Sequence, residues 1–125
     1  MVIIDEAYID FVTSVAVPTA RALLDEFPNV AIMRTFSKAY GMAGIRVGHA
    51  IGTPQLIRVF DRLRNHFGVG RLAQAAALAA LQDSAWLAHV QAEVAAARSR
   101  IAAIAAAEGL RALPSATNFV AIDCG

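Results

Sequence analysis

The chain contains one lysine, Lys38, alongside ten arginines. An arginine guanidinium stays protonated, whereas burial or a neighbouring cation can lower the pKa of a lysine amine until it is a free nucleophile. Such an amine can attack a carbonyl carbon and form a Schiff base. Lys38 lies in the segment from Arg34 to Gly48, which also contains Gly41 and Gly44. This setting predicts covalent chemistry at Lys38; the alternative is one surface lysine in an arginine-favouring composition.

Four other side chains complete a set that suits pyridoxal 5'-phosphate. This cofactor needs an amine for its aldehyde, an anion beside its ring nitrogen, a donor to its ring oxygen and a site for its phosphate. Lys38 can supply the amine, and Asp5 can keep the ring nitrogen protonated, so that the ring accepts electrons when a substrate loses its α-proton. Tyr8 can donate to the ring oxygen. Ser37 and Arg46 can hold the phosphate, the arginine through paired charge-assisted hydrogen bonds.

Two apolar runs predict the strands that position these residues. Residues 2–4 are β-branched, which is typical of a strand buried on both faces of a parallel sheet. Residues 30–35 predict a second strand, which ends shortly before Lys38. Open α/β sheets bind ligands outside the carboxyl ends of their strands. We therefore expect five residues to lie at the same edge of one sheet: Asp5, Glu6, Tyr8, Ser37 and Lys38.

Helix caps and alanine-rich segments predict four helices. Thr53 followed by Pro54 marks a start, because threonine can cap free N–H groups and proline suits the first helical position. Asp83 or Ser84 caps the last helix, and Gly109 ends it. The expected helices span residues 19–27, 54–64, 71–81 and 85–108.

The larger apolar residues of the last helix recur at helical spacing. They predict one buried stripe, in which Trp86 belongs to the core rather than to a cofactor site. Two further strands are expected, at residues 47–51 and 117–122. The stripe consists of Trp86, Leu87, Val90, Val94, Ile101 and Ile104.

Four segments resemble, in order, segments from the second half of histidinol-phosphate aminotransferases, which are fold type I pyridoxal-phosphate enzymes. The resemblance covers nearly the whole chain and implies a fragment of a longer α/β protein. Its large domain would have three layers, α/β/α, around a mostly parallel sheet. Residues 1–82 would be the C-terminal half of that cofactor-binding domain, 83–109 a long inter-domain helix, and 110–125 the start of a small C-terminal domain. The segments are Ile4–Tyr8, Thr35–Gly48, Leu72–Leu81 and Pro114–Val120.

The resemblance also implies roles for individual residues. Lys38 would be the catalytic lysine that binds pyridoxal 5'-phosphate, and Asp5 and Tyr8 would contact its ring nitrogen and ring oxygen. Ser37 and Arg46 would bind its phosphate. The parent enzyme would be a cytoplasmic homodimer of histidine biosynthesis, which transfers an amino group from a small-molecule donor, histidinol phosphate, to a 2-oxo acid, 2-oxoglutarate. The isolated fragment is expected to be inactive.

Other functions stay open at this point. Residues 65–71 read Asn-His-Phe-Gly-Val-Gly-Arg, where the family would have a proline-tyrosine-asparagine type of segment. Aminotransferases of aromatic amino acids and phosphothreonine decarboxylases therefore remain possible. A strand ending in Asp5 and Glu6 also resembles a P-loop ATPase, but the chain has no G-x-x-x-x-G-K-[ST] loop. A truncated, inactive interaction module is the other alternative.

Composition excludes several classes of partner. The chain has 125 residues, of which 58% are hydrophobic and 17% charged, so it is expected to be globular. The net charge of +1 comes from dispersed residues, which argues against nucleic-acid or membrane-surface binding. Uncharged runs fall short of the roughly 18 residues of a membrane span. The single cysteine, Cys124, fits a reducing compartment, and the three histidines share no metal-ligand spacing. Glu6 could be a solvated acid or an acid that supports the site from behind. Arg34 and Arg71 could orient an anionic substrate or form ion pairs on the surface.

Overall fold

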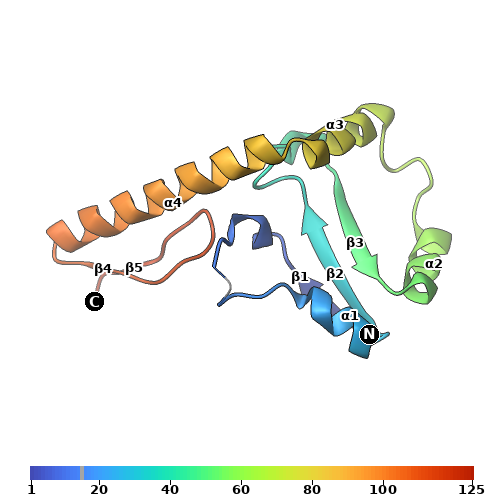
Figure 1. Ribbon diagram of the computed structural model, residues 1–125, viewed down its shortest axis with the longest axis horizontal. Helices are drawn as coiled ribbons and strands as arrows, with labels where there is room; N and C mark the ends of the chain where they lie inside the picture. The colour runs from blue at the N-terminus through green and yellow to red at the C-terminus, as the bar shows by residue number, and fades with distance from the viewer. Residues whose placement is uncertain (15) are drawn as a thin grey trace.

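The computed structural model describes residues 1–14 and 16–125. A three-stranded sheet lies at its centre, in the order β1 (Val2–Asp5), β2 (Val30–Thr35), β3 (Gly48–Gly52) (Figure 1). β1 runs parallel to β2, with Asp5 opposite Met33, whereas β3 runs antiparallel to β2. All three strands lie within one residue of the predicted ranges. The carboxyl ends of β1 and β2 therefore meet at one edge, as predicted.

The core follows the central strand. In β2, Val30, Ala31 and Ile32 are at most 5% exposed, because strands flank them on both sides. The prediction that residues 2–4 are buried on both faces is wrong for this chain: Val2 is 49% and Ile3 56% exposed. β1 pairs only with β2 and forms an edge of the sheet, so its β-branched residues have fewer neighbours than those of β2.

The helices begin and end close to the predicted residues. Thr53 accepts a hydrogen bond from the Leu56 N–H at the start of α2, and Asp83 accepts one from the Trp86 N–H at the start of α4. Gly109 ends α4 with a φ of +73°, a conformation that glycine adopts without strain. The helical elements are η1 (Ile9–Phe11), η2 (Ala20–Ala22), α1 (Leu23–Glu26), η3 (Ala43–Ile45), α2 (Pro54–Leu63), α3 (Arg71–Gln82) and α4 (Ser84–Ala107).

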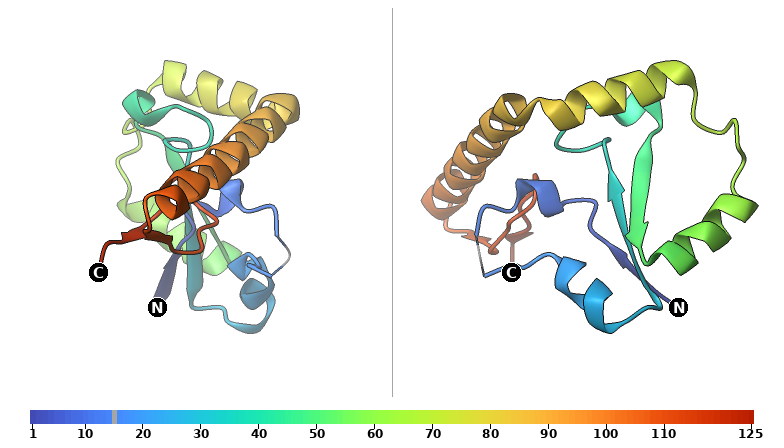
Figure 2. Two further views of the ribbon diagram at one scale, coloured as in Figure 1. Left: turned by 90° about the vertical axis from the view of Figure 1, so that its left-hand side faces the viewer. Right: turned by 45° about the vertical axis from the view of Figure 1, so that its right-hand side comes forward.

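Helix α4 leads away from the sheet, and its far end lies beside a small second sheet of β4 (Arg111–Ala112) and β5 (Ile122–Asp123) (Figure 2). The buried stripe predicted for this helix is wrong: Trp86 is 49% and Ile104 59% exposed. The helix packs on η1 and β4, which cover only part of its length. Within the described residues, no helix combines the length and the apolar character needed to cross a membrane.

The strand predicted for residues 117–122 is also largely wrong, because only Ile122 lies in a strand. The hydroxyls of Ser115 and Thr117 instead bond to the backbone around them. The Ser115 hydroxyl accepts from the Thr117 N–H, and the Thr117 hydroxyl accepts from the Phe119 N–H. Such local bonds compete with a strand ladder, and they shape residues 115–119 into a loop.

Candidate active site

Lys38 lies in the turn that follows β2. Its carbonyl accepts a hydrogen bond from the Gly41 N–H at 2.9 Å, and Gly41 has a φ of +68°. The turn is anchored from inside by Phe36 and Ala39, which are each 3% exposed, while the side of the turn that carries Lys38 faces outward. The Phe36 ring packs against Tyr40, with centroids 5.1 Å apart. Lys38 thus presents an exposed amine from a turn that is fixed by buried apolar side chains.

Tyr8 meets this amine from the end of β1. The Lys38 Nζ lies 5.2 Å from the centroid of the Tyr8 ring, a cation–π distance. On another side the ring meets Phe119 edge-on, with centroids 5.4 Å apart. Phe119 belongs to the C-terminal loop and is 56% exposed. Sequence reasoning missed Phe119, because residues 117–122 were expected to form a strand.

Asp5 ends β1 at the same edge of the sheet. One of its carboxylate oxygens, Oδ1, accepts a hydrogen bond from the Ala7 N–H at 2.9 Å, which starts the turn toward Tyr8. Within the described chain its other oxygen has no hydrogen-bond partner, and the residue is exposed. Asp5 thus presents an acceptor at the edge of the sheet where β1 and β2 end.

The two predicted phosphate ligands lie on either side of the lysine turn. Ser37 precedes Lys38, and its N–H donates to the Thr35 hydroxyl. Arg46 has a left-handed backbone, with φ 59°, which is uncommon for a residue other than glycine. Its Nη1 donates to the Ala43 carbonyl at 2.6 Å, and the rest of the guanidinium is exposed. Among the described residues no hydrogen bond joins Arg46 to Ser37.

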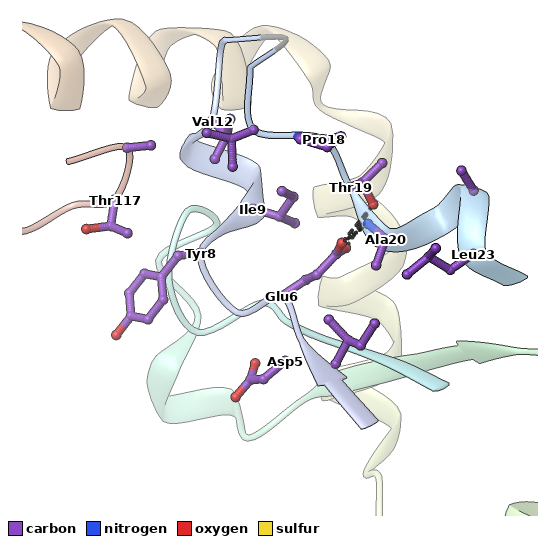
Figure 3. A pocket seen from close by; sticks show the side chains of 14 residues that line it. Asp5, Glu6, Tyr8, Ile9, Val12, Pro18, Thr19, Ala20, Leu23 and Thr117 are labelled. Atoms are coloured by element: carbon purple, nitrogen blue, oxygen red, sulfur yellow. Dashed lines mark hydrogen bonds between the residues drawn. The ribbon is translucent and has the colours of Figure 1, made fainter. Parts of the chain in front are cut away.

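A buried acid lies behind Asp5. Glu6 is 7% exposed, and its side chain points away from that of Asp5 (Figure 3). Its carboxylate accepts hydrogen bonds from the Nε and Nη2 of Arg34 at 3.0 and 2.8 Å, and from the Ala20 N–H at 2.6 Å. The Thr19 hydroxyl donates to it at 2.9 Å. The sequence left the roles of Glu6 and Arg34 open and did not indicate Thr19 as their partner, because this contact depends on how the strands pair.

The surroundings of Glu6 lower its pKa. Burial alone would raise the pKa, but the hydrogen bonds from Ala20, Arg34 and Thr19, together with the charge of Arg34, outweigh burial and hold it below the ordinary value of 4.5. A carboxyl whose pKa is lower in the folded than in the unfolded state stabilises the fold above the unfolded pKa. That contribution is lost as the pH falls through the folded pKa.

We expect the Glu6→Gln variant to lose less stability than the wild type between pH 5 and 3, as measured by urea unfolding. The expected window starts near the ordinary pKa of 4.5 and extends below it. Asp123, whose pKa is lowered by a hydrogen bond from Arg111, provides an exposed comparison. Asp123→Asn should change the profile less, because salt and water screen its exposed pair. Parallel acid profiles for Glu6→Gln and the wild type would contradict the expectation.

A hollow of about 550 Å³ opens beside the turn from Asp5 to Tyr8 (Figure 3). Its walls are mostly apolar and include Val12 and Leu23, and the Lys38 side chain is not among them. Asp5, Glu6 and Tyr8 also line the hollow, so it adjoins the end of β1. Within the described part of the chain, no three His, Cys, Asp or Glu side chains are grouped so that they could hold a metal ion.

Comparison with known protein families shows the family of this chain. The family model of class I and II aminotransferases matches residues 1–124. The chain belongs to the class I and II aminotransferase family. This membership confirms the family that the four segments of the sequence resemble.

Individual class I and II aminotransferases are similar over nearly the whole chain. This chain is 44% identical to a histidinol-phosphate aminotransferase of Bacillus subtilis, over 98% of this chain and 34% of that protein. It is 42% identical to histidinol-phosphate aminotransferase 2 of Pseudomonas fluorescens, over 100% of this chain and 34% of that protein. The crystal structure of the Sinorhizobium meliloti histidinol-phosphate aminotransferase in complex with pyridoxal-5'-phosphate superposes with a TM-score of 0.90. It is 51% identical, over 98% of this chain and 33% of that one.

These comparisons confirm the predicted fold class, part of an α/β aminotransferase domain. The chain spans about a third of the length of the curated relatives that it matches.

Proposed function

We propose that this chain is the lysine-bearing part of a pyridoxal-phosphate-dependent aminotransferase that transfers an amino group from histidinol phosphate to 2-oxoglutarate. The observation that carries the proposal is the exposed Lys38 amine over the Tyr8 ring, at the edge where β1 and β2 end. The similarity to several histidinol-phosphate aminotransferases supports this substrate over an aromatic amino acid or phosphothreonine.

The donor set fits pyridoxal 5'-phosphate. An exposed amine, a phenol and a carboxylate with a free oxygen lie at one edge of the sheet in Lys38, Tyr8 and Asp5. Arg46 uses one N–H on a carbonyl, and a guanidinium has five, so others can bind a phosphate. Ser37 adds a hydroxyl next to the lysine. The groups match the aldehyde, ring and phosphate of the cofactor in chemical type.

When bound, pyridoxal 5'-phosphate supplies an electron sink for the pair left by a departing α-proton. Lys38 would hold the cofactor through its Nζ and, once released as a neutral amine, would move the proton at the substrate α-carbon. Asp5 would hold a proton on the ring nitrogen through its free carboxylate oxygen. Tyr8 would donate its phenolic proton to the ring oxygen, and Ser37 and Arg46 would bind the phosphate.

The decisive experiment uses the protein in the full length that its gene encodes. The purified protein is incubated with pyridoxal 5'-phosphate, reduced with borohydride and mapped for the labelled peptide. A visible absorbance band and label on Lys38 support the proposal, and folded protein without either overturns it. Amino transfer is then compared for histidinol phosphate, phenylalanine and phosphothreonine. Preference for either of the last two would overturn the substrate assignment while leaving the cofactor assignment in place.

Replacing Arg46 with methionine should weaken binding of pyridoxal 5'-phosphate roughly 10- to 100-fold, the range of one lost charge-assisted contact. Methionine, like arginine, is unbranched at Cβ, so the left-handed backbone at this position is disturbed little. Pyridoxal, which lacks the phosphate, is the control ligand. Titration of the absorbance band measures both affinities, and an equal loss for the two ligands would argue against a phosphate contact.

We also infer that the protein acts as a cytoplasmic homodimer. Residues 1–82 would belong to the large domain, residues 83–109 would form a helix between the domains, and residues 110–125 would begin a small C-terminal domain. Large apolar side chains from the end of α2 to the start of α3 are highly exposed, with Leu63 at 79%, Phe67 at 93% and Leu72 at 86%. Exposed apolar patches of this kind suit a subunit interface. Sedimentation equilibrium of the full-length protein tests the dimer, and a monomer at all concentrations would contradict it.

A further inference from the structure

Glu6 is the one charged side chain that is buried among residues 1–14 and 16–125, and the proposed reaction does not use it. We propose that Glu6, Arg34 and Thr19 form a positioning cluster that sets Asp5 and Tyr8 against Lys38 from the opposite face of the sheet. This inference rests on the proposed function, because it concerns the affinity for the cofactor and the pH at which the bound cofactor gains or loses a proton.

The cluster joins three segments at one point. The Glu6 N–H donates to the Met33 carbonyl at 2.9 Å and continues the ladder between β1 and β2. Its carboxylate then pairs with Arg34, the next residue of β2, four residues before Lys38. Its third link is to the Thr19 hydroxyl and the neighbouring backbone N–H, at the start of η2. The pair thus fixes the strand end that bears Asp5 to the strand that carries the lysine turn.

The hydrogen bonds of the cluster leave little room for another arrangement. The Thr19 hydroxyl donates to Glu6 and accepts from Arg34 Nη2 at 3.0 Å and from the Arg21 N–H at 3.3 Å, which uses its one donor and two acceptor positions. The guanidinium of Arg34 meets one Glu6 oxygen through both Nε and Nη2. Within the described residues no buried side-chain nitrogen or oxygen lacks a partner, and rotation of Arg34 or Thr19 would take hydrogen bonds away from the buried Glu6 carboxylate.

An ion pair, rather than apolar side chains, joins the three segments at this place, which indicates that the cluster fixes their relative geometry. An apolar trio would pack the same three segments without desolvating charges, and such replacements are often neutral or stabilising. What an ion pair adds is one defined geometry, whereas apolar contacts tolerate sliding. A geometry that must be maintained to a fraction of an ångström is what a cofactor site requires of its supporting residues.

The cluster acts through Asp5 rather than by contact with the cofactor. Glu6 directly follows β1 (Val2–Asp5), and the close-up shows the Asp5 and Glu6 side chains directed away from each other (Figure 3). Glu6 and Arg34 therefore lie behind the edge where Lys38 and Tyr8 meet. The charge of Arg34 acts on the pKa values of Asp10, Tyr40 and His49, and the charge of Glu6 acts on that of Asp10. All three residues are kept in the test variants, and Thr19→Val also keeps the charges of Arg34 and Glu6.

The test uses the full-length protein loaded with pyridoxal 5'-phosphate, in the variants Glu6→Gln and Thr19→Val. Both are close to isosteric, and Thr19→Val removes only the hydroxyl, so it stays informative if Glu6→Gln fails to fold. The readouts are the dissociation constant of the cofactor and the pH midpoint of its visible absorbance band. We expect the dissociation constant to rise on the order of tenfold, as small misplacements of binding groups weaken a site, and the midpoint to shift. Thr19→Ser, which keeps the hydroxyl, should restore both.

Thr53→Ala serves as the control for lost stability alone, because it removes the N-cap of α2 and touches no residue of the cluster. It should lower the melting temperature without moving the pH midpoint. If the folded Glu6→Gln or Thr19→Val variant keeps the wild-type dissociation constant and midpoint, the cluster only stabilises the fold and the inference is wrong. If the wild type itself forms no absorbance band, the proposed function fails first and the inference fails with it.

Discussion

A Lys38→Ala variant is expected to transfer amino groups at less than about one thousandth of the wild-type kcat, since it loses both the covalent attachment and the proton carrier. Its fold should be retained. Lys38 is exposed, and its one described side-chain contact is with the Tyr8 ring, which is worth about 0.5–1 kcal/mol at an exposed site. Activity would thus fall by orders of magnitude while the melting temperature changes little.

Lys38→Arg is the matched control for this experiment. Arginine keeps the positive charge over the Tyr8 ring but stays protonated, so it can neither attach the cofactor nor carry the proton. Both variants should therefore be inactive, and Lys38→Arg should be the more stable of the two. Stopped-flow absorbance with histidinol phosphate measures the chemistry, and circular dichroism measures the fold. Turnover above a few per cent of wild type in either variant would exclude Lys38 as the catalytic lysine.

The grouping of Asp5, Tyr8 and Lys38 could be predicted from the sequence because it depends on few structural variables. Two short apolar runs define two strands, and if the strands are parallel, the residues that follow them meet at one edge. The sequence motif then limits the chemistry. Helix boundaries at Thr53 and Asp83 were predictable for a similar reason, because caps act within three residues of the chain.

Burial and long-range pairing could not be predicted in the same way. Residues 2–4 have the composition of a central strand, but whether they are covered depends on which strands lie beside them. The pairing of Glu6 with Arg34 joins residues 28 positions apart, and it depends on the register that places Asp5 opposite Met33. The buried stripe predicted for α4 was wrong for a similar reason. Helical spacing shows which residues share one face of a helix, but it does not show whether another element packs on that face.

The close approach of β3 to β2 at Gly48 leads to the second large expected effect. A Cβ at this position would lie 2.7 Å from the Arg34 carbonyl oxygen, a backbone atom that cannot rotate away. In the Gly48→Ala variant the two strands must therefore separate, which strains the hydrogen bond from the Phe36 N–H to the Val47 carbonyl. We expect a loss of about 3 kcal/mol in the free energy of unfolding, at the upper end for overpacking.

The same separation should reach the cofactor site, because Arg34 holds Glu6 and Phe36 supports the lysine turn. Gly48→Ala should consequently bind pyridoxal 5'-phosphate less tightly as well as unfold at lower urea concentration. Gly44→Ala is the matched control: no atom lies within 4 Å of its added Cβ and its φ is not positive, so its stability should stay within about 0.5 kcal/mol of wild type. Equal urea midpoints for the two variants would contradict this expectation. They would mean that β2 and β3 can move apart and accommodate the extra methyl group without loss of stability.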